Sequence, residues 1–335
     1  MGEDEGMVSI RDVAKHAGVA ISTVSKVLNN YPNISEETKA KVNASIKELG
    51  FVPNSIAAAL SSKQSTRVAL LMDVKRQIQT IDEISMQYLL GAIKQAGEIG
   101  MDIITVFFSM LEGKSLEEVI RYFKAQNIAG IVVYGMSKQD TVLHKLVASG
   151  AFKMVLIDAP LVNETTSNVW VNHEQAQYDV AKKMVTEDKA KKILYISGKK
   201  NGYISEERMR GMKRLADELG LKMIVRNGNF SELEARKITM QYAKKRDAIV
   251  CASDMMAIGA MKALIDMDIF RPVCGFDGIT LMGYAGKQMH TVKQDFGAIS
   301  AKAIVEVKAL LEGGKGREII MPHSLVRITY EDVIH

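Results

Sequence analysis

The chain is 335 residues long, carries a net charge of +5 at neutral pH, and is 47% hydrophobic and 25% charged. This length exceeds a single compact core, so two or three globular domains are expected, and no apolar run reaches the roughly 18 residues that span a membrane. The acidic start, residues 1–6, is unlike a signal peptide. We therefore expect a cytoplasmic protein in which Cys251 and Cys274 stay buried and reduced.

Three short helices are predicted near the N-terminus. The first begins at Ser9, where Ser9 and Asp12 have the spacing of a capping box, and it ends at Gly18. The second follows directly, and the third begins after Ser35. Residues 56–60 are too few for a helix that is stable unaided, and a polar linker follows them.

From residue 67 onward, apolar runs alternate with amphipathic segments. Strands are predicted at residues 68–72, 103–107, 130–134, 154–157, 193–197, 248–251 and 273–276. Helices are predicted at residues 85–99, 116–127, 141–149, 173–185, 206–219, 233–244, 254–267 and 296–311. This order predicts an α/β protein with parallel sheets covered by helices on both faces. About ten strands exceed one common doubly wound sheet, so we expect two lobes with a ligand crevice between them.

The predicted domain boundaries follow from this change of pattern. Residues 7–53 form a helical headpiece, and residues 54–66 form a hinge helix and linker. The first lobe of the core comprises residues 67–164 and 295–323. The second lobe comprises residues 165–294 and 324–335.

The first two helices suit the major groove of DNA, because a tight turn between two packed helices lets the second lie in the groove. Gly18 provides the turn, and Ala14 and Val24 allow close packing. Residues 7–63 also carry more basic than acidic side chains, which favours a nucleic-acid partner only weakly. Polar side chains lie on the exposed face of the second helix: Ser22, Thr23, Ser25, Lys26 and Asn29.

Residues 9–30 resemble the DNA-binding headpiece of the LacI/GalR family almost position by position, and residues 34–38 and 49–54 continue the match. The resemblance implies a helix-turn-helix headpiece joined to a core like the type I periplasmic binding proteins. It implies base reading by Ile21, Ser22 and Lys26. It also implies that other side chains contact phosphates or position the helix: Ser9, Thr23, Ser25, Asn29 and Asn54.

Three positions depart from the family pattern and make the DNA site that the protein reads unusual. Lys26 stands where Arg is commonest, and Lys lacks the planar fork that contacts guanine with two hydrogen bonds. Ala20 replaces a capping Ser, and Ala58 replaces a frequent Arg. In the family the hinge inserts a leucine into the minor groove, and Leu60 occupies that position. The alternative for residues 56–60 is a plain linker helix.

Polar side chains in the core have the pattern of a small-molecule site. Three aspartates follow apolar strands, at the ends where crevice ligands bind: Asp73, Asp158 and Asp277. Arg208 offers a forked donor, and Phe230 or Trp170 could stack on a sugar ring. The alternatives are helix caps for the aspartates and a surface helix position for Arg208.

The core also resembles the same family, at residues 207–211, 252–260, 275–277 and 291–296. The resemblance favours Arg208 and Asp277 as effector contacts. Weaker candidates by the same comparison are Asp73, Asp158, Asn172, Phe230, Ser253 and Gln294. Residues 75–80 depart from the family pattern at the rim of the pocket, so the identity of the effector is not implied.

The sequence therefore predicts a sequence-specific DNA-binding regulator, acting as a repressor on a near-palindromic double-stranded operator. A small polar effector, most simply a carbohydrate, would control operator affinity in a homodimer. We expect no membrane association, no cofactor and no metal site. We also expect no enzyme, because no phosphate loop, nucleophile elbow or metal-ligand spacing is present. The alternative is a solute-binding protein of the same core fold without a regulatory role.

Overall fold

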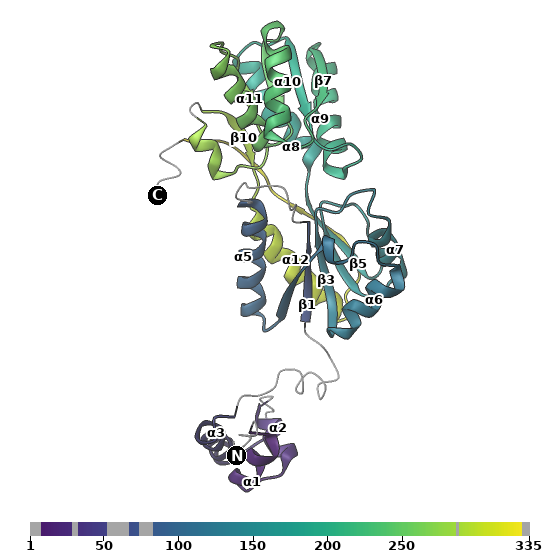
Figure 1. Cartoon of the computed structure of the whole chain (residues 1–335), viewed down its shortest axis with the longest axis vertical. Helices are drawn as coiled ribbons and strands as arrows, with labels where there is room; N and C mark the ends of the chain where they lie inside the picture. The colour runs from purple at the N-terminus through teal and green to yellow at the C-terminus, as the bar shows by residue number, and fades with distance from the viewer. Residues whose placement is uncertain (1–7, 29–32, 52–66, 74–82, 286–287, 330–335) are drawn as a thin grey trace, which may run out of the picture. The chain divides into compact units, whose positions relative to one another are not determined.

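The computed structural model describes residues 8–28, 33–51, 67–73, 83–285 and 288–329. It divides into two compact units, Met1–Ser65 and Thr66–His335 (Figure 1). The predicted fold class, a helical headpiece and a core of two parallel-sheet lobes, is confirmed. Asn29, Asn54 and Leu60, together with the hinge segment at residues 56–60, lie outside the described residues.

The headpiece contains three helices, α1 (Ile10–Ala17), α2 (Ile21–Leu28) and α3 (Glu36–Glu48). They enclose a small apolar core formed by Val13, Ala14, Val24, Val27 and Val42. These residues repeat at helical spacing within each segment, which is why short helices with little intrinsic stability fold against one another.

The ends of α1 follow the chemistry that the sequence indicates. The Asp12 carboxylate accepts hydrogen bonds from the Ser9 backbone N–H at 2.9 Å and from the Ser9 hydroxyl at 2.6 Å. Gly18 ends the helix with φ of 67°, a left-handed conformation that is costly for residues with a Cβ atom. The chain therefore turns directly into α2.

The core unit is built on two six-stranded sheets. The first has the order β11 (Glu318–Met321), β5 (Thr166–Val171), β4 (Lys153–Ile157), β3 (Ile128–Tyr134), β1 (Arg67–Met72) and β2 (Asp102–Phe107). The second has the order β12 (Ser324–Arg327), β10 (His290–Lys293), β9 (Val273–Cys274), β8 (Ala248–Cys251), β6 (Lys192–Ser197) and β7 (Lys222–Asn227). Among the strands described, the pairing is parallel except between β10 and β12.

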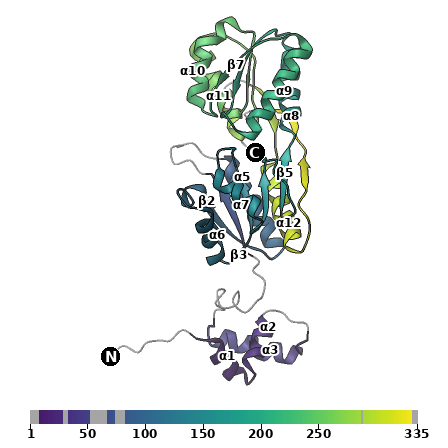
Figure 2. The ribbon, with the colours of Figure 1, turned by 90° about the vertical axis from the view of Figure 1, so that its right-hand side faces the viewer.

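Helices cover both faces of each sheet. In the first lobe, Leu70 of β1 faces α5 (Glu83–Glu98) and α12 (Phe296–Leu311), whereas Leu71 faces α6 (Leu116–Ala125) and α7 (Thr141–Ser149). In the second lobe the helices are α8 (His173–Glu187), α9 (Tyr203–Leu219), α10 (Glu232–Tyr242) and α11 (Asp254–Asp266). Figure 2 shows α8 and α9 on one side of the second sheet and α10 and α11 on the other.

Helices α5 and α12 cross very closely because each has a glycine at the contact. A Cβ atom on Gly91 would lie 2.2 Å from the carbonyl oxygen of Gly297. Any larger side chain at position 91 would therefore push the two helices apart.

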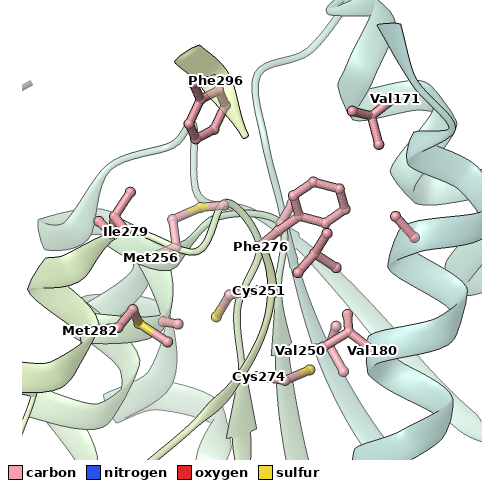
Figure 3. Close-up of a cluster of buried hydrophobic side chains, with 14 of the residues drawn as sticks. Val171, Val180, Val250, Cys251, Met256, Cys274, Phe276, Ile279, Met282 and Phe296 are labelled. Atoms are coloured by element: carbon pink, nitrogen blue, oxygen red, sulfur yellow. The ribbon is translucent and has the colours of Figure 1, made fainter. Parts of the chain in front are cut away.

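The chain passes between the lobes at three places: after β5, between β10 and α12, and between β11 and β12. These crossovers place the carboxyl ends of strands from both sheets toward the lobe junction. A buried cluster lies at this end of the second sheet and contains Cys251 on β8, Cys274 on β9 and Phe276 (Figure 3). Both cysteines are buried free thiols, as the sequence predicts.

One predicted boundary differs from the structure. The sequence assigned residues from 165 onward to the second lobe, but Thr166–Val171 pairs with β4 and β11 in the first sheet. Thr166, Ser167 and Asn168 are buried, so this inner strand has a polar sequence that an apolar-run criterion misses. The strands β7, β10, β11 and β12 were likewise not predicted, being short, charged or only half buried.

Candidate functional site

Helix α2 presents one face to the headpiece core and another to solvent. Val24 and Val27 are buried, whereas Ile21, Ser22 and Lys26 are exposed and lie on one side of the helix. Ile21 is 45% exposed, which leaves its apolar side chain available for contact with a thymine methyl group. The exposure meets the requirement for base reading, and the base-reading role of these residues stays a prediction.

Backbone hydrogen bonds to the Ala20 carbonyl oxygen begin α2. The carbonyl oxygen of Ala20 accepts hydrogen bonds from the N–H groups of Thr23 at 2.9 Å and Val24 at 3.2 Å. A methyl side chain at position 20 cannot accept a hydrogen bond from this turn. Thr23 and Ser25 are half-buried on α2, and Ser9 lies at the start of α1.

A side-chain contact that the sequence did not indicate joins α1 to α3. The Ser45 hydroxyl donates to the Lys41 carbonyl oxygen at 3.0 Å, so it is free to accept from His16 Nδ1, which is also at 3.0 Å. Nε2 of His16 lies 3.5 Å from the Glu48 carboxylate. This contact fixes the helix that braces α2.

In the core, Arg208 is the centre of a buried polar group. It lies on α9, is 2% exposed, and its guanidinium stacks 3.5 Å from the centroid of the Phe276 ring. The guanidinium donates to the Ala252 carbonyl oxygen and to Nδ1 of His173, at 3.3 Å from Nη2 and 3.4 Å from Nε. Its Nη2 atom also lies 3.6 Å from Oδ1 of Asp277.

Asp277 joins this group from the turn after Phe276. Its backbone has φ of 129°, a conformation rarely adopted outside glycine, and its N–H donates to the Val292 carbonyl oxygen at 2.8 Å. The side-chain amide of Gln294 donates to Oδ1 of Asp277 at 3.3 Å. Burial raises the pKa of Asp277 to about 8, although the Arg208 charge acts in the opposite direction.

A second carboxylate reaches the group through His173. Oδ1 of Asp158 lies 2.8 Å from Nε2 of His173, and the same oxygen accepts from the Val171 N–H at 3.3 Å. Burial lowers the pKa of His173, so its neutral form is favoured next to Arg208. The sequence placed His173 at the start of a helix but gave no sign of its partners, Arg208 and Asp158, which lie 35 and 15 residues away in the chain.

Asp254 is a further buried carboxylate that sequence reasoning missed. It accepts hydrogen bonds from the N–H groups of Gly278 at 2.7 Å and Ile279 at 3.0 Å, and from the Thr291 hydroxyl at 2.6 Å. Burial raises its pKa to about 6. These bonds hold the turn that carries Asp277, so Asp254 positions a predicted contact.

Two other predicted effector contacts use their side chains as helix caps. Asn172 accepts from the Gln175 N–H at 2.9 Å at the start of α8, and Ser253 accepts from the Met256 N–H at 3.3 Å at the start of α11. Both residues border the Arg208 group in sequence, next to His173 and Ala252. Their role in effector binding stays a prediction.

The remaining predicted contacts have their observed interactions outside the Arg208 group. Asp73 is exposed at the end of β1, with its carboxylate 4.0 Å from Nζ of Lys199. The Phe230 ring packs over Gly198, where a Cβ atom would lie 2.1 Å from it. Glu207, next to Arg208 and not predicted, is partly buried, and this raises its pKa to about 7.

The described residues contain neither a membrane-spanning helix nor a cluster of metal-ligating side chains. Within the described residues, no helix combines the length and apolar character needed to cross a bilayer. No group of three or more potential metal-ligating side chains occurs in that part of the chain either.

Comparison with known families gives two matches that follow the two units. The model for bacterial regulatory proteins of the lacI family matches residues 9–54. A periplasmic binding protein domain matches residues 80–315, which is more than half of the chain.

Proteins that are similar to this chain along most of its length are named as transcriptional regulators or repressors. The ribose operon repressor of Halalkalibacterium halodurans is 29% identical over 310 residues, covering 90% of each chain. The transcriptional regulator AscG of Escherichia coli is 26% identical over 322 residues, covering 92% of this chain and 93% of the relative.

Solved structures show the same fold. A Lac repressor dimer bound to operator and the anti-inducer ONPF superposes with a TM-score of 0.82 at 23% identity, covering 96% of this chain and 98% of the other. The regulator CelR in complex with cellobiose gives 0.71 at 22% identity, covering 96% and 99%. With a lacI-family headpiece and a periplasmic-binding-protein core in one chain, this protein belongs to the lacI family and is a DNA-binding transcriptional regulator.

Proposed function

We propose that this regulator is a cytoplasmic homodimeric repressor, without a catalytic step, whose operator affinity is set by an uncharged polyhydroxylated effector. The effector binds at the lobe junction against Arg208 and Asp277. The observation that carries the proposal is the group formed by the buried residues Arg208, His173 and Asp277 together with the partly buried Asp158. Buried charges are retained where they serve a ligand or a structural switch, because their desolvation is costly.

The hydrogen-bonding capacity of this group favours a ligand rich in donors. The Arg208 guanidinium already donates to Ala252 and His173 and lies 3.6 Å from Asp277 as an ion pair. Acceptor capacity remains on the carboxyl groups of Asp158 and Asp277 and on Oε1 of Gln294, which is buried and has no hydrogen-bond partner among the described residues. Sugar hydroxyl groups supply the donors that such acceptors need.

The charge of the group argues against an anionic effector. Arg208 lies 3.6 Å from Asp277, Asp158 contacts His173, and burial raises the pKa of Glu207 and Asp277, which disfavours negative charge at these two positions. A sugar phosphate or sugar acid would add more negative charge to this site. A neutral sugar avoids that cost, and the names of the ribose repressor and of the CelR–cellobiose complex agree with a carbohydrate.

An exposed apolar stripe supports dimerisation. Met86, Leu90 and Ile93 are spaced at helical intervals on α5, and each is exposed. A second copy of the chain would bury this stripe and place two headpieces on one DNA duplex. Two equivalent headpieces on one duplex read a near-palindromic operator. Effector binding would then shift the lobes of both subunits and alter how the headpieces fit the operator.

A ligand screen on the purified protein tests the effector class. Thermal unfolding would be followed with neutral sugars and, for each, its phosphorylated and carboxylated counterpart, because a bound ligand raises the midpoint by mass action. We expect the hits to be neutral sugars. A phosphorylated or carboxylated hit with no effect from the neutral sugar would contradict the proposed class. An operator selected from random DNA would then show whether the hit weakens DNA binding, as expected for an inducer of a repressor.

A further inference from the structure

Side chains from the two lobes contact each other directly on one side of the junction. Glu83 is the first residue of α5 in the first lobe, and Thr280 is the first residue of the short 3-10 helix η3 (Thr280–Tyr284) in the second lobe. The Thr280 N–H lies 3.0 Å from Oε1 and 2.9 Å from Oε2 of Glu83, and the Thr280 hydroxyl donates to Oε2 at 2.7 Å. One carboxylate thus caps a helix that belongs to the other lobe.

The Glu83 carboxylate is oriented before it meets the second lobe. The Gln87 side-chain amide, one turn along α5, donates to Oε1 at 2.9 Å. A side chain fixed in this way loses less conformational entropy when it forms the contact between lobes. The contact is nevertheless exposed to solvent, so it can break and reform.

A second contact between lobes lies on the other side. Nζ of Lys138 lies 2.6 Å from Oε2 of Glu206, and the Lys138 N–H donates to the Asn201 carbonyl oxygen at 3.4 Å. In Figure 1, α5 and α7 flank the first lobe on opposite sides, and Lys138 comes shortly before α7. Both flanks of the junction are therefore bridged by polar contacts.

We propose that the Glu83–Thr280 contact is a latch that holds the two lobes closed in the absence of effector. Between the flanking contacts, Arg208 and Asp277 are 2% and 7% exposed. Asp158 of the first lobe lies 2.8 Å from His173 of this group, so a ligand placed between Asp158 and the Arg208 group requires the lobes to separate. The latch therefore sets the fraction of molecules that can admit a ligand, and apparent affinity falls in proportion to that fraction.

The latch is specific in chemistry. Its three contacts join a carboxylate at position 83 to a backbone N–H and a hydroxyl at position 280, and a carboxylate accepts such hydrogen bonds more strongly than a neutral amide does. Glu83→Gln keeps the size of the side chain and removes the charge, and Thr280→Ala removes only the hydroxyl. Both positions are exposed or half-buried, so neither change creates a cavity in a core.

Distance measurement by electron paramagnetic resonance on the full-length protein, without effector or DNA, tests the latch. Spin labels would be placed through Lys145→Cys on α7 and Lys213→Cys on α9, which are exposed positions in different lobes, while the native cysteines are buried. Labelled protein would be diluted with unlabelled protein so that only distances within one chain contribute. The matched control is Glu98→Gln, an exposed residue at the other end of α5.

We expect one predominant distance for the parent protein and a second, longer distance in Glu83→Gln, with the closed-to-open ratio reduced about fivefold to tenfold. Thr280→Ala should shift the ratio in the same direction by a smaller factor. Distributions for Glu83→Gln and Thr280→Ala that match the parent, or an equal shift in Glu98→Gln, would overturn the latch. Only the effect of the latch on effector affinity rests on the proposed function. A ligand screen without hits therefore does not change what the distance measurement says about the latch.

Discussion

Replacing Asp277 by asparagine tests the electrostatics of the buried group. Burial raises the pKa of Asp277 from 3.8 to about 8, so the folded protein holds this proton at neutral pH and the unfolded chain releases it. Stability supplied by Asp277 is therefore fully present below pH 3.8 and is lost as pH rises through about 8. Each pH unit within that window corresponds to about 1.4 kcal/mol, so the interval from pH 5 to 8 amounts to about 4 kcal/mol.

Asparagine has the shape of the protonated acid, and the parent already holds a non-glycine residue with φ of 129° at this position. The stability advantage of the Asp277→Asn protein over the parent should thus grow by about 4 kcal/mol between pH 5 and pH 8. Urea unfolding followed by circular dichroism at fixed protein concentration measures the difference, with Asp217→Asn on the exposed face of α9 as control. Parallel pH curves for Asp277→Asn and the parent would show that Asp277 ionises normally beside Arg208 and would refute the argument.

Three further substitutions test other parts of the molecule. Lys26→Ala should abolish the preference for the selected operator over random DNA in gel-shift titrations. The control Lys47→Ala on α3 should keep this preference. If the Lys26→Ala protein also keeps it, Lys26 does not read a base. Arg208→Ala should remove the heat of effector binding in calorimetry and leave operator affinity within about twofold, so a normal titration would count against its role. Ser45→Ala should lower the free energy of unfolding of the headpiece by about 1 kcal/mol, because His16 loses its hydrogen-bond partner. Scanning calorimetry would show this as a lower midpoint temperature for the headpiece transition. An unchanged midpoint would show that the contact is energetically neutral.

The headpiece was predictable because its signals are local. The spacing of Val13, Val24 and Val27 defines the buried faces, and Gly18 marks the turn. Capping and hydrophobic periodicity act within a few residues along the chain, so a sequence shows them directly.

The core was less predictable where the fold buries polar residues. Strand β5 contains Ser167, whose hydroxyl donates to the buried carboxylate of Glu306 on α12 at 2.9 Å. That partner lies 139 residues away, and no local pattern indicates it. The functional role of His173 was likewise not predicted, because its partners lie far away in the chain. The role of Asp254 was not predicted because its three hydrogen-bond donors come from a turn and a strand later in the chain.

The three crossovers between the lobes also determine the order in which this protein can be completed on the ribosome. The face of the first sheet that contains Leu70 is covered by α5 and α12, and α12 is synthesised only after residues 172–293 of the second lobe. Strand β11 then extends the edge at β5. The first lobe therefore emerges first but is completed only after most of the second lobe, with an apolar sheet face open to chaperones in the meantime, and β12 of the second lobe is the last strand to emerge.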